Sequence, residues 1–557
     1  MRTHYPRTRH LPWSPGATAD DLRVTGLSGL RGREVVVTEK LDGENTTLYA
    51  DGLHARSLDS AHHPSRTWVK ALQARIGHAI PEGWRVCGEN MFARHSLPYD
   101  NLDSWFYGFS VWDRDGRCLG WDRTVAFLRG LGVPVPRVLW RGLFDERALR
   151  GLRLDLGRQE GYVVRVVDGF GAEDFGTCVA KWVRAGHVRT DTHWMHAAVV
   201  ENGLGAQAPL WAVRSGAPAD ADALAEAVGL PGEGDRKAVA RFDPAGRTGD
   251  DRLVGVLAAL LHDHDQGGRR ARLAARLAGG VGMPLARRVA DLVGLHPALH
   301  RPYPDQDRGT GLARLSLTAD LGLLHAVARA TAATDEAREQ VEWSALHAEE
   351  VRALDEAALR EAFAGLSPDA AVRCRAEARE AYARGRVVSV EEAVAATWRW
   401  RSGAFPRLIQ LVGPAGSGKS TFARGLGGVD AYVSLDDLRE ARGARADQRA
   451  NPDVLRAGLD RLDGALAAGG TTVWDATSLT HQQRSLVHTV AHRRNALITH
   501  AVVLIDEDEL TGRNTRREHP VPPEVLAAQL RRFAPPYPGD AHRTWYIGAS
   551  GTIEEEV

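Results

Sequence analysis

Four charged residues in the first 200 positions of this 557-residue chain lie in or beside apolar stretches typical of buried strands: Lys40, Glu89, Glu160 and Lys181. A lysine or carboxylate inside an apolar strand costs free energy unless it is paired or does chemistry. Considered singly, each is explained as a solvent-facing strand residue. Considered together, two ammonium groups and two carboxylates are suited to a site for phosphate and a hard divalent cation.

A glycine-rich stretch near the C-terminus predicts a second phosphate site. Arg407–Val412 is an apolar run typical of a buried strand, and a helical pattern follows the glycines at Phe422–Leu426. This strand–loop–helix order is the context that a P-loop requires. In such a loop the backbone N–H groups bind phosphate, Lys419 reaches the β- and γ-phosphates, and Ser420 binds Mg²⁺. The residues expected to bind nucleotide are Gly413, Gly416, Ser417, Gly418, Lys419, Ser420 and Thr421.

The bulk composition limits the class of protein. A chain of this length with 43% hydrophobic and 25% charged residues is expected to form two to four globular domains. Lys+Arg and Asp+Glu are equal at 71 each, so any basic groove for nucleic acid must be local. The four cysteines are widely spaced and predict neither a zinc site nor a disulfide framework. Without a signal peptide or a membrane-length apolar run, we expect a soluble cytoplasmic protein with no membrane partner.

The N-terminal candidates require a framework of short strands. The pattern predicts an α+β domain with antiparallel sheets over residues 1–204, with one helical segment at Pro64–Ile76. The basic start, Tyr5–Pro12, is either an extended arm or a segment that folds over a bound nucleotide. The predicted strands are Val35–Thr38, Thr46–Tyr49, Trp84–Cys87, Phe106–Trp112, Tyr162–Val167 and Cys178–Val183.

The order of the charged residues along these strands resembles the covalent nucleotidyltransferases, a superfamily of polynucleotide ligases and RNA capping enzymes. Lys40-Leu41-Asp42-Gly43 is similar to their signature lysine motif, KxDG. One such motif is a weak signal, but six in the family's order are a strong one. The resemblance covers nearly all of the first 200 residues and implies an ATP-grasp-like ligase domain. The other five motifs are similar to Arg56, Gly88-Glu89-Asn90, Phe106–Phe109, Glu160–Val164 and Val179–Trp182.

Two departures from the commonest motifs refine the resemblance. DNA ligases and capping enzymes usually place an arginine two residues after KxDG, whereas this chain has Asn45 there, as RNA ligases do. The last motif commonly has two lysines one residue apart, and here Val183 takes the second position with Arg184 beside it. Asn45 therefore implies an RNA ligase, and the role of Arg184 as a second positive charge stays open.

By this resemblance Lys40 attacks the α-phosphate of ATP and becomes bonded to AMP. The attacking amine must be unprotonated, so we expect burial and neighbouring cations to lower its pKa. The AMP then passes to an RNA 5′-phosphate and leaves when a 3′-hydroxyl attacks. Glu160 is the expected ligand of Mg²⁺ or Mn²⁺. The expected nucleotide-binding residues are Glu39, Asn45, Arg56, Glu89, Phe109 and Lys181, with Phe109 stacking on adenine.

Residues 396–557 resemble the polynucleotide kinases over their whole length. Apolar runs after the P-loop lead into aspartates, and the carboxyl edge of a parallel sheet is where an α/β fold places its chemistry. The resemblance implies that Asp436 is the general base on an RNA 5′-hydroxyl. It assigns the acceptor to Arg439, Asp475 and Thr477, and the transferring phosphoryl group to Lys419, Arg513 and Arg517.

Residues 205–395 are expected to form an all-α middle domain. A Gly-, Ala- and Pro-rich stretch at 203–218 predicts a linker before it, and four leucines between positions 253 and 261 mark one helix face. His262-Asp263 follows, with His296, His300 and Asp320 downstream. Two interpretations stay open: a degenerate site of the HD-type metal phosphohydrolases, or polar residues at a helix C-terminus.

Together these features predict a bifunctional RNA repair enzyme that uses ATP and Mg²⁺ or Mn²⁺. Its kinase would supply the 5′-phosphate that its ligase consumes, and its partners would be RNAs with broken or 5′-hydroxyl ends, tRNA among them. Two alternatives are a DNA-directed kinase-ligase and an RNA-binding scaffold with a regulatory nucleotide-sensing P-loop domain. Asn45 argues against the first, and Asp436 with Arg439 against the second.

Overall fold

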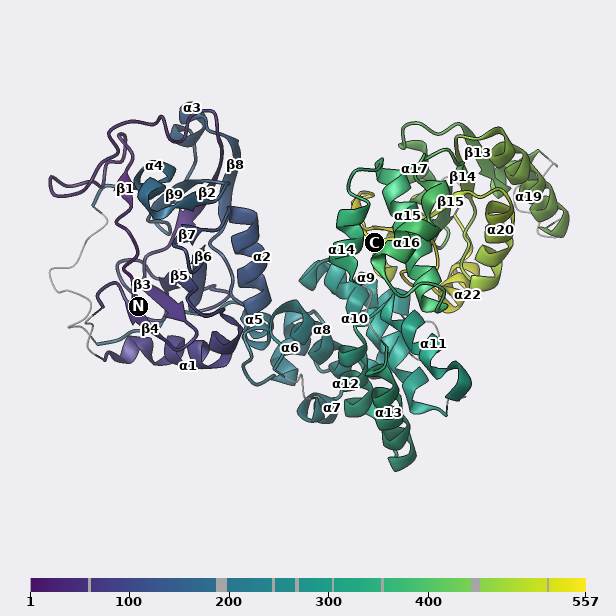
Figure 1. The fold of residues 1–557 in the computed structure, drawn as a ribbon, viewed down its shortest axis with the longest axis horizontal. Helices are drawn as coiled ribbons and strands as arrows, with labels where there is room; N and C mark the ends of the chain where they lie inside the picture. Colours follow the sequence, from purple (N-terminus) through teal and green to yellow (C-terminus); the bar gives the residue numbers. More distant parts are fainter. Residues whose placement is uncertain are drawn as a thin grey trace. The chain divides into compact units, whose positions relative to one another are not determined.

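The computed structural model describes residues 2–58, 62–186, 198–242, 246–265, 270–302, 305–351, 355–441, 451–517 and 520–557. The chain packs into two compact units. The first comprises residues 1–227 and 245–253, and the second comprises residues 228–244 and 254–557. Figure 1 colours the chain from its purple N-terminus to its yellow C-terminus. In the described part of the chain, no helix combines the length and apolar character needed to cross a membrane.

The first unit is built on two β-sheets. A five-stranded sheet has the order β1-β11-β9-β2-β8, and a six-stranded sheet has the order β10-β7-β6-β5-β3-β4. Neighbouring strands are antiparallel except β1, which runs parallel to β11. The strands are β1 Arg9–His10, β2 Glu34–Lys40, β3 Glu44–Tyr49, β4 Gly52–Ala55, β5 Arg85–Asn90, β6 Phe106–Trp112, β7 Arg117–Cys118, β8 Val138–Leu143, β9 Gly161–Val166, β10 Phe170–Gly171 and β11 Val179–Val183.

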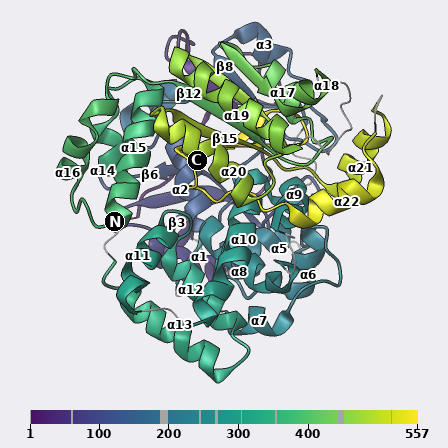
Figure 2. The same cartoon turned by 90° about the vertical axis from the view of Figure 1, so that its right-hand side faces the viewer.

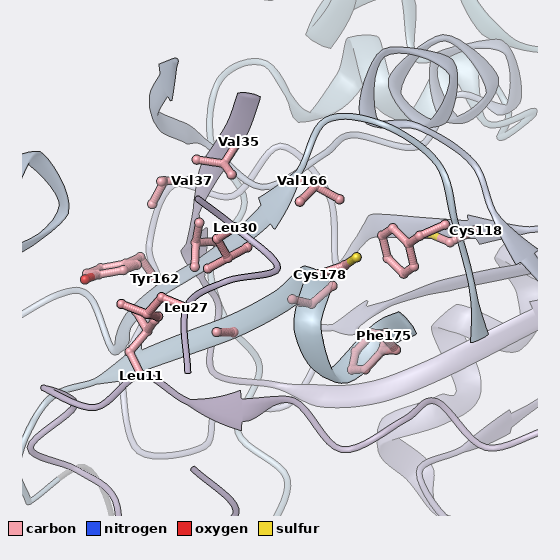
Figure 3. Packing of buried hydrophobic residues seen from close by; sticks show 14 of the residues in the cluster. Leu11, Leu27, Leu30, Val35, Val37, Cys118, Tyr162, Val166, Phe175 and Cys178 are labelled. Carbon is pink, nitrogen blue, oxygen red and sulfur yellow. The ribbon is translucent and has the colours of Figure 1, made fainter. Parts of the chain in front are cut away.

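Two hydrophobic clusters hold these sheets in place. One is centred on the five-stranded sheet, and Figure 3 shows Leu27 and Leu30 among its members beside Val37 and Tyr162. The other packs helices α1 (Thr67–Ile76) and α2 (Trp121–Leu131) against the six-stranded sheet, with Leu72 and Leu128 fully buried. The short helices α3 (Glu146–Arg150) and α4 (Phe175–Cys178) contribute Leu149, Phe175 and Cys178 to the first cluster. The predicted α+β framework is present, and each of its six predicted strands overlaps an observed strand, with bounds that differ by at most three residues.

The glycine-rich stretch at 203–218 is not a linker. Asn202 just before it donates through its side-chain amide to the Met91 carbonyl at 2.8 Å and accepts from the Tyr99 N–H at 3.0 Å. A Cβ on Gly203 would lie 3.0 Å from the backbone of Asp100, so this glycine allows a close approach between chain segments. Helices α5 (Ala208–Arg214) and α6 (Ala221–Ala227) follow in the same unit. The prediction was wrong because composition alone does not distinguish flexibility from close packing.

The described residues between 208 and 400 form helices and turns only. The four leucines between positions 253 and 261, three in α8 and one directly after it, are all buried, as their spacing predicts. After α6 the helices are α7 Arg236–Arg241, α8 Gly249–Leu260, α9 Arg270–Val281, α10 Met283–Leu295, α11 Asp305–Ser316, α12 Leu321–Thr331, α13 Asp335–Ala348, α14 Glu356–Ala362, α15 Pro368–Ala383 and α16 Val390–Ala396.

The C-terminal part of the second unit contains one sheet with helices on both faces. Its order is β13-β14-β12-β15-β16-β17, and every neighbouring pair is parallel except β16 with β17. The strands are β12 Arg407–Val412, β13 Ala431–Ser434, β14 Thr471–Asp475, β15 Leu497–Val503, β16 Arg543–Ile547 and β17 Ile553–Glu556. The helices are α17 Lys419–Arg424, α18 Leu435–Glu440, α19 Asn451–Ala468, α20 His481–Arg493, α21 Glu507–Thr515 and α22 Pro523–Arg532.

Side-chain alternation on the central strand β12 explains why both faces of this sheet are covered. Leu408 packs into a cluster with Leu462 of α19 and Val487 of α20. The next residue, Ile409, packs on the other face in a cluster with Ala423 of α17. Figure 2 shows these helices beside the sheet. The parallel strands therefore end at one common edge, where the P-loop begins.

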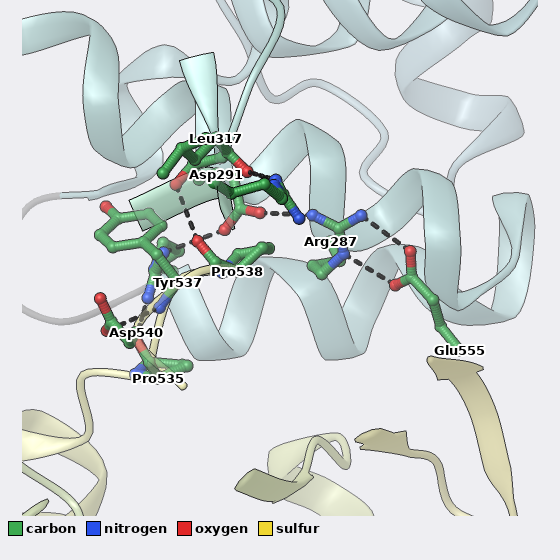
Figure 4. Close-up of polar contacts among 11 residues, drawn as sticks. Arg287, Asp291, Leu317, Pro535, Tyr537, Pro538, Asp540 and Glu555 are labelled. Carbon is green, nitrogen blue, oxygen red and sulfur yellow. Dashed lines mark hydrogen bonds and ion pairs between the residues drawn. The ribbon is translucent and has the colours of Figure 1, made fainter. Parts of the chain in front are cut away.

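A buried polar network joins the helical region to this sheet within the second unit (Figure 4). Arg287 of α10 forms two 2.7 Å hydrogen bonds with the carboxylate of Glu555 on β17. Asp291, one turn further along α10, accepts from Arg287 at 2.7 Å and from Arg270 of α9 at 2.9 Å. Arg270 also donates to the Pro535 carbonyl. The helices and the P-loop sheet thus share one packed interior.

Candidate active sites

Lys40 ends strand β2, and Glu160 immediately precedes strand β9. The two strands are antiparallel neighbours with Lys40 opposite Gly161, so their register brings the two charged side chains together. The Lys40 Nζ lies 2.5 Å from Oε2 of Glu160. The Glu160 side chain is only 8% exposed and that of Lys40 23%, so solvent screens this ion pair weakly.

Glu89 reaches the same site from the other sheet. It lies on β5 opposite Asn45 of β3, and its Oε1 accepts a hydrogen bond from the Gly43 N–H at 3.2 Å. Burial raises the pKa of the Glu89 carboxyl to about 7; the nearby Lys40 opposes the rise and the Glu160 charge adds to it. Two interacting carboxylates are a suitable oxygen donor set for a hard divalent cation.

The pKa of Lys40 is raised, not lowered as its expected role requires. Burial lowers it, but the carboxylates of Glu160 and Glu89 outweigh burial and keep the ammonium form stable. The prediction is wrong for the nucleotide-free protein because the nearest charges are anionic. Before Lys40 can attack phosphorus, its proton and its contact with Glu160 must both be lost.

The pKa of Lys181 is lowered, whereas that of Lys40 is raised. It lies on β11, and burial followed by the charge of Lys40 lowers its pKa, with Arg56 acting in the same direction. Arg184 is buried and donates to the Leu156 carbonyl, while Val183 lies in the core. The arginine whose charge reaches Lys181 is therefore Arg56, and the side chain of Arg184 is engaged elsewhere.

Phe109 and Glu39 contact other groups of this unit. The Phe109 ring contacts the Tyr5 ring edge-on, with centroids 5.2 Å apart, so the N-terminal arm packs against the residue expected to stack on adenine. The arm then pairs with β11, with His10 opposite Lys181. Glu39 precedes Lys40 on β2, so its side chain lies on the opposite face of the strand. There it interacts with Gln159.

Two charged residues near Lys40 position its loop, and their roles were not evident from the sequence. Asp42 accepts backbone hydrogen bonds from Ser96 at 2.9 Å and Leu97 at 3.0 Å. Glu44 forms a buried ion pair with Arg66, whose Nε lies 2.8 Å from Oε2. Because Arg66 lies 22 residues away and has no pattern around it, only the fold identifies it as the partner.

In the second unit the P-loop connects β12 to α17. Gly413, Gly416 and Gly418 have φ values of 154°, 83° and 94°, in the region that favours glycine. The Gly413 N–H donates to the Thr477 carbonyl at 2.9 Å, which fastens the loop to the segment after β14. Lys419 is 8% exposed and its Nζ lies 3.4 Å from the Pro414 carbonyl. Ser420 and Thr421 follow in the first turn of α17.

Arg513 of α21 and Arg517, two residues after that helix, lie beside this loop. Arg513 donates to the Ser417 carbonyl at 3.4 Å and forms an ion pair with Glu509 at 2.7 Å. A Cβ built on Gly416 would lie 3.8 Å from Nη1 of Arg517, so this guanidinium also borders the loop. The fold thus brings both sequence-predicted arginines to the phosphate-binding loop.

The expected acceptor residues occupy the carboxyl edge of the sheet beside the P-loop. Asp436, in the first turn of α18, forms an ion pair with Arg439 at 2.5 Å. Asp475, the last residue of β14, is 8% exposed and accepts a hydrogen bond from the Tyr432 hydroxyl. Burial lowers the pKa of Lys419, while the carboxylates of Asp475 and Asp436 oppose this effect. The two aspartates are therefore close enough to Lys419 for their charges to affect its pKa.

Comparison with protein families matches one family model to each of the two regions that contain these sites. Residues 33–183 match the family model described as RNA ligase. The N-terminal unit carries an RNA ligase domain. Residues 408–536 match a model described as AAA domain, and the P-loop sheet is the corresponding part of the chain. Among curated proteins, none matches this sequence significantly.

Solved structures resemble parts of the chain. The Pnkp1/Rnl/Hen1 RNA repair complex matches with a TM-score of 0.21 and 22% identity, over 23% of this chain and 44% of that one. A Naegleria gruberi RNA ligase mutant with AMP and Mn matches with a TM-score of 0.23 and 17% identity, over 29% and 52%. A sugar kinase from Janibacter sp. HTCC2649 matches with a TM-score of 0.22 and 20% identity, over 26% and 86%. This chain spans about half of the first two, and such scores carry no argument about function.

The match to the RNA ligase model includes all four charged residues that open the sequence analysis. Lys40, Glu89, Glu160 and Lys181 fall inside residues 33–183, and the fold gathers them between two sheets of the ligase domain. The ligase domain therefore contains a lysine, two close carboxylates and a second lysine in one partly buried site. Such a site can bind a phosphate group and present one amine to it.

Proposed function

We propose that this protein is an RNA end-repair enzyme whose P-loop domain phosphorylates RNA 5′-hydroxyl ends and whose ligase domain joins the resulting 5′-phosphate to a 3′-hydroxyl. The observation that carries the proposal is the Lys40 site inside a region that matches the RNA ligase family. The P-loop site supports the second activity through its loop geometry and the aspartates beside it. The two activities form a sequence, since one makes the group that the other consumes.

In the proposed ligase reaction Lys40 attacks the α-phosphorus of ATP, the bond to pyrophosphate breaks, and a lysyl-AMP forms. Glu160 holds the lysine in place but also stabilises its ammonium form, so the carboxylate must be engaged elsewhere at the moment of attack. Lys181 would bind the phosphate, whose negative charge would stabilise the ammonium form that burial and Lys40 disfavour. AMP then passes to the RNA 5′-phosphate and is released when the 3′-hydroxyl attacks.

A divalent cation, Mg²⁺ or Mn²⁺, fits the carboxylates of this site. Glu160 and Glu89 would hold it, because both are carboxylates within electrostatic reach of Lys40 and of each other. When bound, the cation would neutralise phosphate charge and compete with Lys40 for Glu160. Mutants of the Naegleria gruberi RNA ligase have been solved with AMP and Mn and with ATP and Mn.

In the proposed kinase reaction the P-loop backbone and Lys419 bind the donor phosphates, and Ser420 is the expected ligand of Mg²⁺. Asp436 would accept the proton of the RNA 5′-hydroxyl, and Arg439, with which it is paired, would hold the acceptor phosphate. Arg513 and Arg517 border the loop and would stabilise the charge of the transferring phosphoryl group.

The test uses the full-length chain with a labelled 5′-hydroxyl RNA, ATP and Mg²⁺. Wild type should give first a 5′-phosphorylated RNA and then a joined product. Lys40→Ala should stop at the phosphorylated RNA, and Lys419→Ala should leave 5′-hydroxyl RNA unchanged but still join RNA supplied with a 5′-phosphate. Lys70→Ala, an exposed lysine on α1, is the matched control and should behave as wild type.

The outcomes separate the alternatives. Joining by Lys40→Ala would refute the ligase assignment, and phosphorylation by Lys419→Ala would refute the kinase assignment. Equal or faster reaction on a DNA strand of the same sequence would move the proposal to a DNA-directed enzyme. Nucleotide binding with no phosphate transfer to any 5′ end would make the P-loop domain a regulatory sensor.

A further inference from the structure

The pair His262-Asp263, for which the sequence left two interpretations open, lies in a short turn after α8. His262 Nε2 is 3.2 Å from Oδ2 of Asp235, whereas Nδ1 is 3.1 Å from Oδ1 of Asp263. The two ring nitrogens face in different directions, so these carboxylates do not converge on one ion. Asp320 caps helix α12 by accepting from the Leu323 N–H at 2.7 Å. These contacts fit polar residues at helix ends.

An exposed tryptophan follows helix α16 in the same unit. Trp398 begins a 3₁₀ turn, Trp398–Trp400, and is 72% exposed. Among the described residues its side chain has neither an aromatic nor a hydrogen-bonding partner. Aromatic side chains are among those that gain most from burial. A partner outside this chain that covered the indole would recover that gain.

The neighbouring Trp400 shows that this turn is held together without Trp398. Trp400 is 9% exposed and packs in a cluster with Phe405. The guanidinium of Arg373 lies 3.4 Å from the centroid of its ring, and that of Arg399 lies 3.9 Å from it. Residues two apart in a 3₁₀ helix point in different directions, so Trp400 anchors the turn while Trp398 faces away.

Two arginines of this turn have no carboxylate partner among the described residues, and both are exposed. Arg401 follows Trp398 by three residues, and side chains at this spacing lie above one another in a 3₁₀ helix. Arg399 donates to a neutral oxygen, Oδ1 of Asn495, at 3.2 Å. The turn therefore presents two uncompensated positive charges beside an exposed indole.

Asn495 joins the turn to the end of helix α20. Its backbone carbonyl accepts a hydrogen bond from Arg373 of α15, the helix beside α16 in Figure 2. Arg493 and Arg494, directly before Asn495, share the carboxylate of Asp463, with contacts at 2.7 Å and 2.9 Å. Two arginines on one carboxylate leave one positive charge over, so the basic surface continues across the end of α20.

The acidic residues of α16 do not cancel this charge. Glu391 and Glu392 lie in the first turn of that helix, at the opposite end from Trp398. An anionic partner therefore meets arginines and an indole where it approaches Trp398, and the carboxylates lie beyond the helix.

This surface lies at the end of the sheet away from the P-loop. Asn495 precedes β15, which is parallel to β12 with Leu497 opposite Arg407. The P-loop follows the other end of β12, a strand of six residues that spans about 20 Å. An RNA end bound at the proposed kinase site is therefore too far from Trp398 to contact it, whereas nucleotides further along the strand can reach it.

We propose that Trp398, with Arg399, Arg401 and the arginines at the end of α20, binds single-stranded RNA away from its ends. A base would stack on the indole ring, and the guanidinium groups would contact the phosphates beside it. Paired bases in a duplex offer no free face to the indole, so the surface favours single strands. The choice of RNA rests on the proposed function, because RNA is the substrate of both proposed activities.

Binding is tested with the full-length chain and a circular single-stranded RNA, without ATP or Mg²⁺. A circle has no ends, so neither proposed active site can hold its substrate. Trp398→Ala should weaken binding about tenfold, as expected for the loss of one stacked base, and Trp398→Phe should restore part of it. Trp343→Ala, which removes an exposed tryptophan of α13, is the matched control and should bind as wild type does. Equal affinities of Trp398→Ala and wild type would overturn the surface.

The arginines are tested by the salt dependence of the same binding. Each lost phosphate contact should reduce the slope of log K against log salt by about 0.7 for a single strand. Arg399→Gln and Arg401→Gln should each show this reduction, whereas Trp398→Ala should keep the wild-type slope because stacking releases no counterion. Arg241→Gln, at an exposed position on α7, is the matched control. A wild-type slope in both arginine variants of the turn would refute the phosphate contacts.

Phosphorylation separates this surface from the proposed function. Trp398→Ala should raise the KM for a long 5′-hydroxyl RNA about tenfold at unchanged kcat. It should leave a 5′-hydroxyl dinucleotide unaffected, because that substrate cannot reach from the kinase site to Trp398. Equal effects on both substrates would make Trp398 a structural residue and overturn the surface.

Two further outcomes are distinguishable. Wild type that neither phosphorylates nor joins RNA, but whose binding of the circle depends on Trp398, would overturn the proposed function and leave this surface standing. Binding to vesicles of anionic lipid that Trp398→Ala loses, without any binding of RNA, would overturn RNA as the partner.

Discussion

Asp291 supports a sharp prediction about stability, because it is the shared partner of two buried arginines (Figure 4). Its side chain is 5% exposed and accepts from Arg270 at 2.9 Å and from Arg287 at 2.7 Å. The substitution Asp291→Asn keeps the shape of the side chain but removes its negative charge. Arg287 retains the carboxylate of Glu555, whereas Arg270 loses its carboxylate partner and, among the described residues, is left with neutral groups: the new amide, the Pro535 carbonyl and the face of the Tyr537 ring.

The expected loss in the free energy of unfolding follows from the buried charge of Arg270, which no longer has a carboxylate partner. Removing one member of a buried ion pair costs about 3–5 kcal/mol, because a charge is left buried without a partner. The matched control is Asp335→Asn, since Asp335 pairs with Arg338 but its side chain is 92% exposed. Exposed pairs of this kind contribute about 0–1 kcal/mol. The two substitutions remove the same charge and should differ by at least about 2 kcal/mol in the free energy of unfolding.

The assay is urea unfolding of the full-length protein, followed by hydrogen exchange of peptides from the second unit. The network lies wholly in that unit, so the transition of the ligase domain should keep its midpoint in both variants. Burial raises the pKa of the Asp291 carboxyl. A loss below about 1 kcal/mol for Asp291→Asn would show that burial leaves this group neutral and would refute the reasoning.

Three further predictions concern other parts of the molecule. Glu160→Gln removes the closest anion from Lys40, so the pKa of the lysine should fall. An amine-directed reagent should then label Lys40 about tenfold faster per unit of pKa shift, as measured by mass spectrometry without nucleotide. An unchanged labelling rate would contradict this. Gly132→Ala should destabilise the ligase domain by about 1–3 kcal/mol from backbone strain at φ 75°, with more from collision with the end of α5, as measured by thermal unfolding. Burial lowers the pKa of His488 to about 3 and that of His500 well below its ordinary value, so between these values and pH 6.5 only the unfolded chain takes up the protons. Stability should therefore fall below pH 6.5, by about 2 kcal/mol at pH 5 from His488, with His500 acting in the same direction, and urea midpoints equal at pH 7 and pH 5 would refute this.

Local patterns in the sequence predicted where the longer N-terminal strands lie and which residues form the P-loop. Apolar runs bounded by turn residues located six of the eleven strands described in the first unit, because strand formation depends on side-chain alternation and burial that are visible along the chain. The P-loop was equally readable, since its glycines, Lys419 and Ser420 are consecutive and their roles depend on local backbone geometry.

Contacts between residues far apart in the sequence could not be predicted from it. His262 contacts Asp235, and the loop of Lys40 depends on Arg66, but nothing in the sequence joins either pair. The stretch at 203–218 has the composition of a linker, yet its glycines serve close backbone contacts. Such contacts are made across the fold, so composition and spacing along the chain carry no record of them.

The sequence by itself determined that Lys40 follows an apolar strand and precedes Asp42-Gly43, and that carboxylates recur at positions 89 and 160. Only the tertiary structure decided the charge state of Lys40. A pKa depends on the distances to all nearby charges and on burial, and the fold places Glu160 at 2.5 Å while Lys181 contributes less. The same residues, at other distances, would have produced the lowered pKa that their types suggest.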